Sequence, residues 1–215
     1  MYTLYWETLS GSIGPHVMLE ELGVEYTLRH IDMARGEHRA ESYKAICPSM
    51  RIPALKFADG VVIGETSAIM LTLGERHPDA ELLPLPGSAD KPVFLYWLLH
   101  MATQGYPTFS RSWHPEQFTD DPNGEAGIKR IAGKNLDAFF RSIEEGIEGR
   151  TTFLKRGFTC LDIYLCMLTL WMPDRPSFLA NYPKIERVCS GVERRRSYQT
   201  VAQLHGLSEE TIKAD

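Results

Sequence analysis

The 215-residue sequence is poor in cysteine and contains no long hydrophobic run. Its cysteines form no C-x-x-C pair and have no histidine at zinc-ligand spacing, so neither a disulfide scaffold nor a metal site is expected. They are Cys47, Cys160, Cys166 and Cys189, which we interpret as small buried hydrophobic residues. No run of about 18 apolar residues is present, which disfavours a membrane span. The chain opens on strand-like residues 2–6 without the pattern of a signal peptide, so we expect a soluble, cytoplasmic protein.

An excess of positive charge is also lacking. Lys and Arg number 23 against 28 Asp and Glu, which gives a net charge of −5. This balance argues against general binding to nucleic acid or to anionic membranes. Hydrophobic residues make up 43% and charged residues 24%, a composition that excludes a disordered chain and permits one or two domains with a substantial core.

The first third of the chain alternates strand and helix signals. Ile13, Val17 and Leu22 share one helix face, and Gly23 is expected to end that helix. Asp59-Gly60 lies between two apolar runs, as in a hairpin turn. The expected elements are strand 2–6, helix 13–22, strand 24–31, helix 38–46, strands 53–57 and 61–63, and helix 66–76. This order predicts a βαβ unit followed by a hairpin, and therefore an α/β domain with a mixed sheet.

A proline-rich segment separates this region from a part without strand patterns. Residues 78–90 contain three prolines and are interpreted as a linker. Helices are then expected at 92–104, 125–147, 159–172 and 182–196, with an irregular stretch at 106–123. Helix 159–172 is apolar nearly all round, as expected at a domain centre. The predicted organisation is an α/β domain over residues 1–77 and an all-helical domain over residues 91–215.

Three local motifs resemble those of the cytosolic glutathione transferase superfamily. Residues 46–55, ICPSMRIPAL, are similar to its N-P-x-G-x-V-P-x-L segment, and residues 65–69, ETSAI, to its E-S-x-A-I turn. Thr159-x-x-Asp162 is similar to the capping motif of its central helix and should form a reciprocal cap. The resemblance covers essentially the whole chain and is closest to bacterial beta-like or related serine-type members. It implies a thioredoxin-like first domain with a four-stranded mixed sheet.

The resemblance implies a glutathione site in the first domain. In the superfamily the Ile52–Pro53 bond is cis, and the residue before the proline offers its backbone N–H and C=O to the peptide ligand, with Arg51 beside it. Glu65 and Thr66 would hold the ammonium and carboxylate of the γ-glutamyl end, with Thr66 as a helix N-cap; a plain helix cap is the alternative. The departures from the superfamily patterns are Cys47, Met50 and Thr66.

Glutathione chemistry requires a thiolate, which an ordinary thiol pKa of about 8.5 disfavours at neutral pH. The start of the first helix supplies positive potential. Residues 11–16, GSIGPH, are similar to the beta-type pattern C-S-L-x-P-H, so Ser12 is the first candidate to donate a hydrogen bond to the sulfur and Ser10 the second. The alternative is that both serines only cap the helix.

Residues of the second domain suit a hydrophobic co-substrate site. The candidates are Trp97, His100, Met101, Tyr106, Phe109 and Trp113. They suit an apolar electrophile, and each has a place in the helical core as its alternative. His100 and His114 are candidate acids or bases, or else solvated histidines. The run Arg194-Arg195-Arg196 is interpreted as a solvated helix end.

The sequence therefore predicts a glutathione transferase that conjugates the glutathione thiolate to an apolar electrophile, with a role in detoxification. One alternative is another glutathione-dependent enzyme, namely a thioltransferase, peroxidase, isomerase or lyase. The other is a non-catalytic binding or regulatory protein that has kept the fold. The resemblance further implies a homodimer, with no nucleic-acid or membrane partner.

Overall fold

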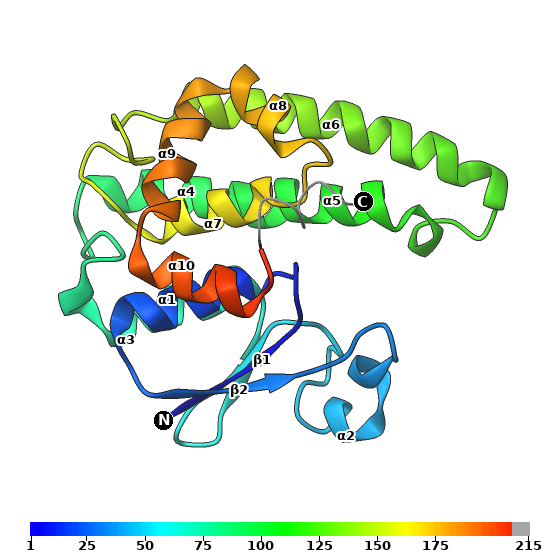
Figure 1. Cartoon of the computed structure of the whole chain (residues 1–215), viewed down its shortest axis with the longest axis horizontal. Helices are drawn as coiled ribbons and strands as arrows, with labels where there is room; N and C mark the ends of the chain where they lie inside the picture. Colours follow the sequence, from blue (N-terminus) through cyan, green and yellow to red (C-terminus); the bar gives the residue numbers. More distant parts are fainter. Residues whose placement is uncertain (208–215) are drawn as a thin grey trace.

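A computed structural model describes residues 1–207 of the protein (Figure 1). A sheet lies along one side, a middle layer holds α1, α3 and α10, and the remaining long helices form a layer beyond them. The elements of the α/β part are β1 (Tyr2–Trp6), α1 (Ile13–Leu22), β2 (Tyr26–His30), α2 (Glu41–Lys44), β3 (Ala54–Lys56), β4 (Val62–Gly64) and α3 (Thr66–Arg76). The helical part contains α4 (Asp90–His100), a π-helical turn (Met101–Gly105), α5 (Tyr106–Trp113), α6 (Glu125–Gly146), α7 (Cys160–Thr169), α8 (Arg175–Asn181), α9 (Pro183–Glu193) and α10 (Arg196–Leu204).

The sheet has the strand order β2-β1-β3-β4. β1 runs parallel to β2, and β3 is antiparallel to both β1 and β4. α1 ends at Gly23, which adopts the left-handed conformation with φ of 60° and donates its N–H to the Glu20 carbonyl oxygen. The predicted fold class, a thioredoxin-like mixed sheet followed by helices, is confirmed.

One continuous hydrophobic cluster joins the sheet, the middle layer and the helical part. Every residue of α7 is buried, as expected of a helix without a polar face. α1 contacts α7 on one side and α10 on another, so it is buried among elements that are far apart in the sequence. The α/β part therefore contributes to the same core as the helices that follow it.

The helical part is more regular than the sequence predicts. The stretch 106–123 is expected to be irregular, yet Tyr106–Trp113 forms α5. Pro107 does not prevent this, because it stands in the first turn, where a missing N–H costs little. A π-helical turn joins α4 to α5, and its last residue, Gly105, leaves room for Phe139, whose ring would lie 2.6 Å from a Cβ there.

Two helices, α8 and α10, were not predicted. Both are short, and each buries only one or two apolar residues, Phe178 in α8 and Tyr198 and Val201 in α10. The polar sequence from Gly206 onward predicts a frayed tail, and residues 208–215 of this tail lie outside the described part of the chain.

The reciprocal cap of α7 is confirmed and does more than the sequence indicates. The Asp162 carboxylate accepts the backbone N–H of Thr159 at 2.7 Å, and the Thr159 hydroxyl accepts the N–H of Leu161 at 3.3 Å. The second carboxylate oxygen accepts the N–H of Phe153 at 2.6 Å. Because Asp162 is fully buried, it both caps α7 and holds the incoming loop against the core.

The hydrogen bonds of Asp162 predict a large loss of stability on its removal. Asp162→Ala leaves two buried N–H groups without acceptors, and each unpaired group costs about 1–3 kcal/mol. We expect the free energy of unfolding, measured by urea denaturation, to fall by about 2–5 kcal/mol, and by less in Asp162→Asn, which keeps one acceptor. Asp120→Ala, at an exposed position, should change it by less than about 0.5 kcal/mol. Equal stability of Asp162→Ala and wild type would contradict this role.

Two buried histidines, His16 of α1 and His205 at the end of α10, contact each other and link the two helices. His16 Nδ1 lies 3.0 Å from His205 Nε2, and His16 Nε2 lies 3.0 Å from the Tyr26 hydroxyl. The His205 ring also packs on the Trp6 ring at a centroid distance of 4.5 Å. Burial lowers the pKa of His16 to about 4; burial and the neighbouring His16 lower the pKa of His205 to about 3. Both rings are therefore neutral in the folded protein.

This histidine pair predicts that stability falls as the pH is lowered from about 6.5 toward 4. In this pH range the two histidines bind protons in the unfolded chain but not in the folded chain. The free energy of unfolding should therefore decrease by up to about 2 kcal/mol per histidine at pH 5. His205→Gln should flatten this slope in urea denaturation between pH 7 and pH 5. His114→Gln, at an exposed histidine, should leave it unchanged. A His205→Gln slope equal to that of wild type would rule out the pair as its cause.

Candidate functional site

The loop between β1 and α1, residues 7–12, is closed by its own serines. The hydroxyls of Ser10 and Ser12 both donate toward the Glu7 carbonyl oxygen, at 2.8 Å and 3.0 Å, and lie 2.7 Å from each other. Ser12 is fully buried, whereas Ser10 is partly exposed. Ser12, the first candidate donor, is therefore placed to hold the loop, and Ser10 is the serine with an accessible side. Neither acts as a side-chain cap of α1.

The carboxylate of Glu7 fixes the beginning of the same loop. It accepts hydrogen bonds from the Met33 N–H at 2.9 Å, from the Thr8 N–H at 2.7 Å and from His30 Nε2 at 2.9 Å. Burial opposes its ionisation, but these bonds outweigh burial and lower the pKa of Glu7. The loop is thus tied to the chain that follows β2.

Two residues of the helical part, Trp171 and Tyr106, contact this loop from the other side. The indole N–H of Trp171 donates to the Leu9 carbonyl oxygen at 2.7 Å, and the Tyr106 ring packs edge-on against Trp171 at 4.8 Å. A Cβ on Gly11 would lie 2.5 Å from the Tyr106 hydroxyl oxygen and 2.7 Å from Thr66 Oγ1. Position 11 therefore has to be glycine for the loop, α3 and α5 to meet this closely.

The start of α3 meets the loop through Thr66. Its buried hydroxyl donates to the Gly11 carbonyl oxygen at 2.9 Å. The predicted N-cap role of Thr66 is wrong, because Glu65 occupies the cap position, with φ of 63°, and Thr66 is the first helical residue. The backbone N–H groups of the first turn have no side-chain cap, and the Glu65 side chain is exposed.

The segment before β3 lies beside the start of α3. Ala54 pairs with Gly64 in the β3–β4 ladder, so the cis Ile52–Pro53 peptide and Glu65 flank the same end of the two strands. Within residues 1–207, the N–H and C=O of Ile52 form no hydrogen bond. The Arg51 side chain is exposed. The fold therefore brings the glutathione-binding candidates of the first domain together, next to the 7–12 loop.

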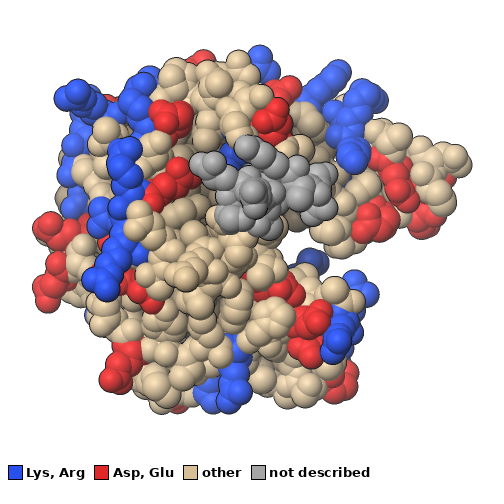
Figure 2. Space-filling view, in the orientation of Figure 1, with Lys and Arg blue, Asp and Glu red and all other residues tan. Residues whose placement is uncertain are grey.

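Only some of the predicted co-substrate residues reach this place. Tyr106 and Phe109 contact the Trp171 ring, and the indole N–H of the exposed Trp113 donates to the Trp171 carbonyl oxygen at 3.2 Å. Figure 2 shows an open notch between the sheet side and the protruding ends of α5 and α6. These aromatic residues thus form a candidate apolar wall contributed by α5 and the end of α7.

The structure corrects the predicted co-substrate role of three residues, Trp97, His100 and Met101. The Trp97 ring packs on Phe153, His100 Nε2 lies 3.1 Å from the Ser142 hydroxyl of α6, and Met101 is fully buried. These contacts form the packing of the helical part, because this side of α4 is covered by α6 and by the loop before α7. Sequence spacing alone does not distinguish that side from one that lines a site.

Two functional candidates were missed by sequence reasoning. Trp171 lies at the end of a predicted apolar helix. The one signal in the sequence is its indole N–H, a hydrogen-bond donor that requires an acceptor within the protein. Tyr164 is 1% exposed in α7. Its pKa is raised well above the usual value by burial, and further by the neighbouring Tyr106 and Glu65. Nothing in the local sequence distinguishes this tyrosine from the other residues of the apolar helix.

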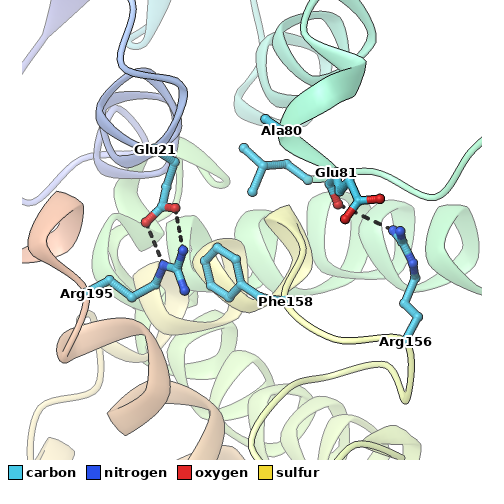
Figure 3. Close-up of a pocket in the computed structure, with 7 residues that line it drawn as sticks. Glu21, Ala80, Glu81, Arg156, Phe158 and Arg195 are labelled. Atoms are coloured by element: carbon cyan, nitrogen blue, oxygen red, sulfur yellow. Dashed lines mark hydrogen bonds and ion pairs between the residues drawn. The ribbon is translucent and has the colours of Figure 1, made fainter.

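A cavity with a volume of about 440 Å³ lies elsewhere, at another junction of the two parts (Figure 3). Glu21 accepts two hydrogen bonds of 2.6 Å from Arg195, whose guanidinium lies 3.8 Å from the centre of the Phe158 ring. Burial opposes ionisation of Glu21, but Arg195 and Ser197 outweigh it and lower the pKa of Glu21. Because these charges are paired, the cavity is a polar joint between α1 and the start of α10.

Metal and membrane features are not found in the described part of the chain. Among residues 1–207, no three His, Cys, Asp or Glu side chains gather as a metal site. None of the described helices combines the length and apolar character needed to cross a bilayer.

Comparisons with known proteins agree with this architecture. A family profile described as "Glutathione S-transferase, N-terminal domain" matches residues 12–76. The chain is 26% identical over 169 residues to the "Glutathione S-transferase GstA" of Escherichia coli O157:H7, which covers 78% of this chain and 81% of that protein. It is 31% identical over 133 residues to the "Transcriptional regulator URE2" of Saccharomyces cerevisiae, covering 54% of this chain and 38% of the regulator. A crystal structure of a glutathione transferase homologue from sulfitobacter with bound glutathione matches with a TM-score of 0.88 at 22% identity, over 95% of this chain and 98% of the other.

The three kinds of likeness are complementary. The profile covers α1, the cis-proline segment and α3, which surround the 7–12 loop. The bacterial relative extends the likeness into the helical part, and the crystal structure shows that the whole fold is shared. Residues 12–76 of the protein are therefore similar to the glutathione S-transferase N-terminal domain family, and its whole fold is that of glutathione transferase structures.

Proposed function

We propose that the protein is a glutathione transferase that conjugates glutathione to an apolar electrophile. The observation that carries this proposal is the meeting of three elements at one place. The 7–12 loop contacts Thr66 at the start of α3, and the cis Ile52–Pro53 segment flanks the same strand ends as Glu65. The loop, at Gly11, adjoins both Thr66 and Tyr106 of the helical part, whose ring packs on Trp171.

The binding chemistry follows from the groups left without partners. The Ile52 N–H and C=O can pair with the peptide backbone of glutathione. The free N–H groups at the start of α3 attract the γ-glutamyl carboxylate, and the exposed Glu65 complements its ammonium. Arg51, exposed beside Ile52, is placed to meet the other carboxylate of the peptide. Thr66 acts by positioning the α3 start against Gly11.

The proposed reaction takes place at the 7–12 loop. The positive end of α1 favours the thiolate over the thiol. Of the two serines, Ser10 is the one that can contact the sulfur, because the Ser12 side chain is fully buried. The thiol releases its proton to solvent. The thiolate then forms a carbon–sulfur bond with an electrophile held near Tyr106 and Trp113, and the bond to the leaving group breaks as that group departs with its electron pair as an anion. Proximity and thiolate stabilisation supply the rate enhancement.

A second candidate function is non-catalytic glutathione binding in a regulatory protein. The identity of 31% with a yeast transcriptional regulator over 133 residues favours it, as do the departures at Cys47 and Met50. The other glutathione-dependent reactions use the same site and differ in the second substrate. The homodimer, the cytoplasmic location and the role in detoxification that the resemblance implies stay predictions.

Retention on immobilised glutathione, followed by turnover of a generic aromatic electrophile, separates these functions. A transferase should be retained, should elute with free glutathione, and should form the thioether at a rate above that of the buffer. Retention without turnover of several electrophile classes would favour the binding protein. Absence of retention would contradict both.

The placement of Glu65 predicts a loss of glutathione affinity without a loss of chemistry. Its carboxylate lies at the γ-glutamyl end, remote from the sulfur, and contributes equally to the ground and transition states. Removing a hydrogen bond to a charged group costs about 1.5–3 kcal/mol, so Glu65→Gln should raise the glutathione KM by about 10- to 100-fold with kcat nearly unchanged. The measurement is steady-state kinetics with varied glutathione.

Glu75→Gln is the matched control, because Glu75 is an exposed glutamate on the same helix. It should leave KM and kcat at the wild-type values. If Glu65→Gln lowered kcat and left KM unchanged, Glu65 would act on the chemistry and its assignment to the γ-glutamyl end would be wrong.

A further inference from the structure

The serines of the 7–12 loop have little capacity left for a ligand. Three hydrogen-bonding contacts join Ser10, Ser12 and the Glu7 carbonyl oxygen. Two hydroxyls supply only two protons for these three contacts. Turning the Ser10 proton toward a thiolate therefore removes support from the loop, and the Ser12 side chain has no exposed surface. A thiolate at this loop needs a further donor.

The Tyr106 hydroxyl stands at this point of the loop. It lies so near Gly11 that a Cβ there would be 2.5 Å from its oxygen. The Gly11 backbone hydrogen-bonds to it, and because the main-chain donor is N–H, the Tyr106 oxygen is the acceptor. Within residues 1–207, the sealed side-chain polar atoms without a partner are His38 Nδ1, Ser88 Oγ and His205 Nδ1. The Tyr106 hydroxyl is not one of them, and no side-chain hydrogen bond of the described residues has it as donor, so its proton remains available to a ligand.

The position of the Tyr106 ring is held by its surroundings. The ring packs edge-on against Trp171 at 4.8 Å, and the Trp171 indole N–H is bonded to the Leu9 carbonyl oxygen. Tyr106 directly follows the π-helical turn Met101–Gly105, and such turns often place a side chain at a functional site. The same indole therefore positions both the ring and the loop, which limits movement of the hydroxyl relative to the loop.

The charges around the hydroxyl belong to the proposed glutathione site. Burial raises the pKa of Tyr106 to about 12; Glu65 acts in the same direction and Arg51 in the opposite one. The hydroxyl consequently keeps its proton at neutral pH and remains a donor. The charges of Glu65 and Arg51, the groups proposed to hold the two ends of the peptide, therefore act on this hydroxyl.

We propose that Tyr106, a residue of the helical part, donates the hydrogen bond that stabilises the sulfur of bound glutathione, an inference that rests on the proposed function. The donor of this protein then comes from α5, across the notch from the sheet. Tyr106 is a catalytic residue in this role, and Ser10 and Ser12 are positioning residues that hold the loop under it. The thiol proton itself leaves to solvent, and Tyr106 keeps its own.

The expected size of the effect follows from the strength of such a bond. Loss of one hydrogen bond to a charged group corresponds to about one to two units in the pKa of the bound thiol. At a pH below both midpoints this is about 10- to 100-fold less thiolate. Tyr106→Phe keeps the ring and its contact with Trp171, so it removes the donor and leaves the packing in place.

The test is the ultraviolet absorbance of the thiolate in the enzyme–glutathione complex, followed against pH for wild type, Tyr106→Phe and Ser10→Ala. We expect Tyr106→Phe to move the midpoint up by about one to two units, to lower kcat by about 10- to 100-fold at a pH below both midpoints, and to recover rate at higher pH. Glutathione affinity, measured by calorimetry, should stay within about threefold of wild type. Tyr96→Phe, at an exposed tyrosine of α4, should match wild type in every measurement.

The outcomes separate this inference from the proposed function. If wild type binds glutathione, and Tyr106→Phe binds it equally with an unchanged midpoint, the inference is overturned and the proposed function stands. A shift in Ser10→Ala alone overturns it as well and assigns the donor to the loop. If wild type does not bind glutathione, the proposed function fails and the inference fails with it.

Discussion

The close approach of the helical part to the loop after β1 is the constraint on which the rest of the site depends. It is possible because residue 11 has no side chain, so that the Tyr106 hydroxyl and the Thr66 hydroxyl can both come against the backbone there. Trp171 adds a hydrogen bond to the neighbouring Leu9 carbonyl oxygen. Four elements thereby meet at one turn: the 7–12 loop, α3, α5 and the end of α7.

Buried hydrogen bonds and an ion pair at other places, which we call polar joints, fix the relative positions of the helices around this contact. Asp162 joins the start of α7 to the loop before it, the His16–His205 pair joins α1 to α10, and Glu21–Arg195 joins α1 to the start of α10. Each joint lies at the edge of, or inside, one shared apolar core, where an unpaired polar group would be costly. The apolar contacts supply the driving force for assembly, and the polar joints select the relative placement of the helices.

The proposed division of labour follows from this arrangement. The α/β part offers backbone groups and a helix terminus, which suit a peptide with charged ends. The helical part offers aromatic rings and the Tyr106 hydroxyl, which suit an apolar reactant and a developing thiolate. At this place the α/β part contributes the first kind of group and the helical part the second, so the proposed chemistry belongs to the junction between them. This also explains why the cavity of about 440 Å³ at the other junction, with its paired charges, has no role in the site.

The sequence by itself determined the features that depend on neighbours along the chain. Alternation of apolar residues, the Asp59-Gly60 turn, Gly23 and the Thr159–Asp162 pair were sufficient for β1, α1, the hairpin, α3 and the cap of α7, because these are local propensities and local hydrogen bonds. The local motifs also located Ile52 and Glu65, which the fold then brought side by side. Tertiary structure decided which residues face the notch. Trp97 and Tyr106 are both aromatic residues of helices, and only the packing of α6 against α4 and of Trp171 against α5 separates the first from the second. Burial of Ser12 and the opening beside Tyr106 likewise arise from contacts between residues about 95 to 160 positions apart, which no local pattern encodes.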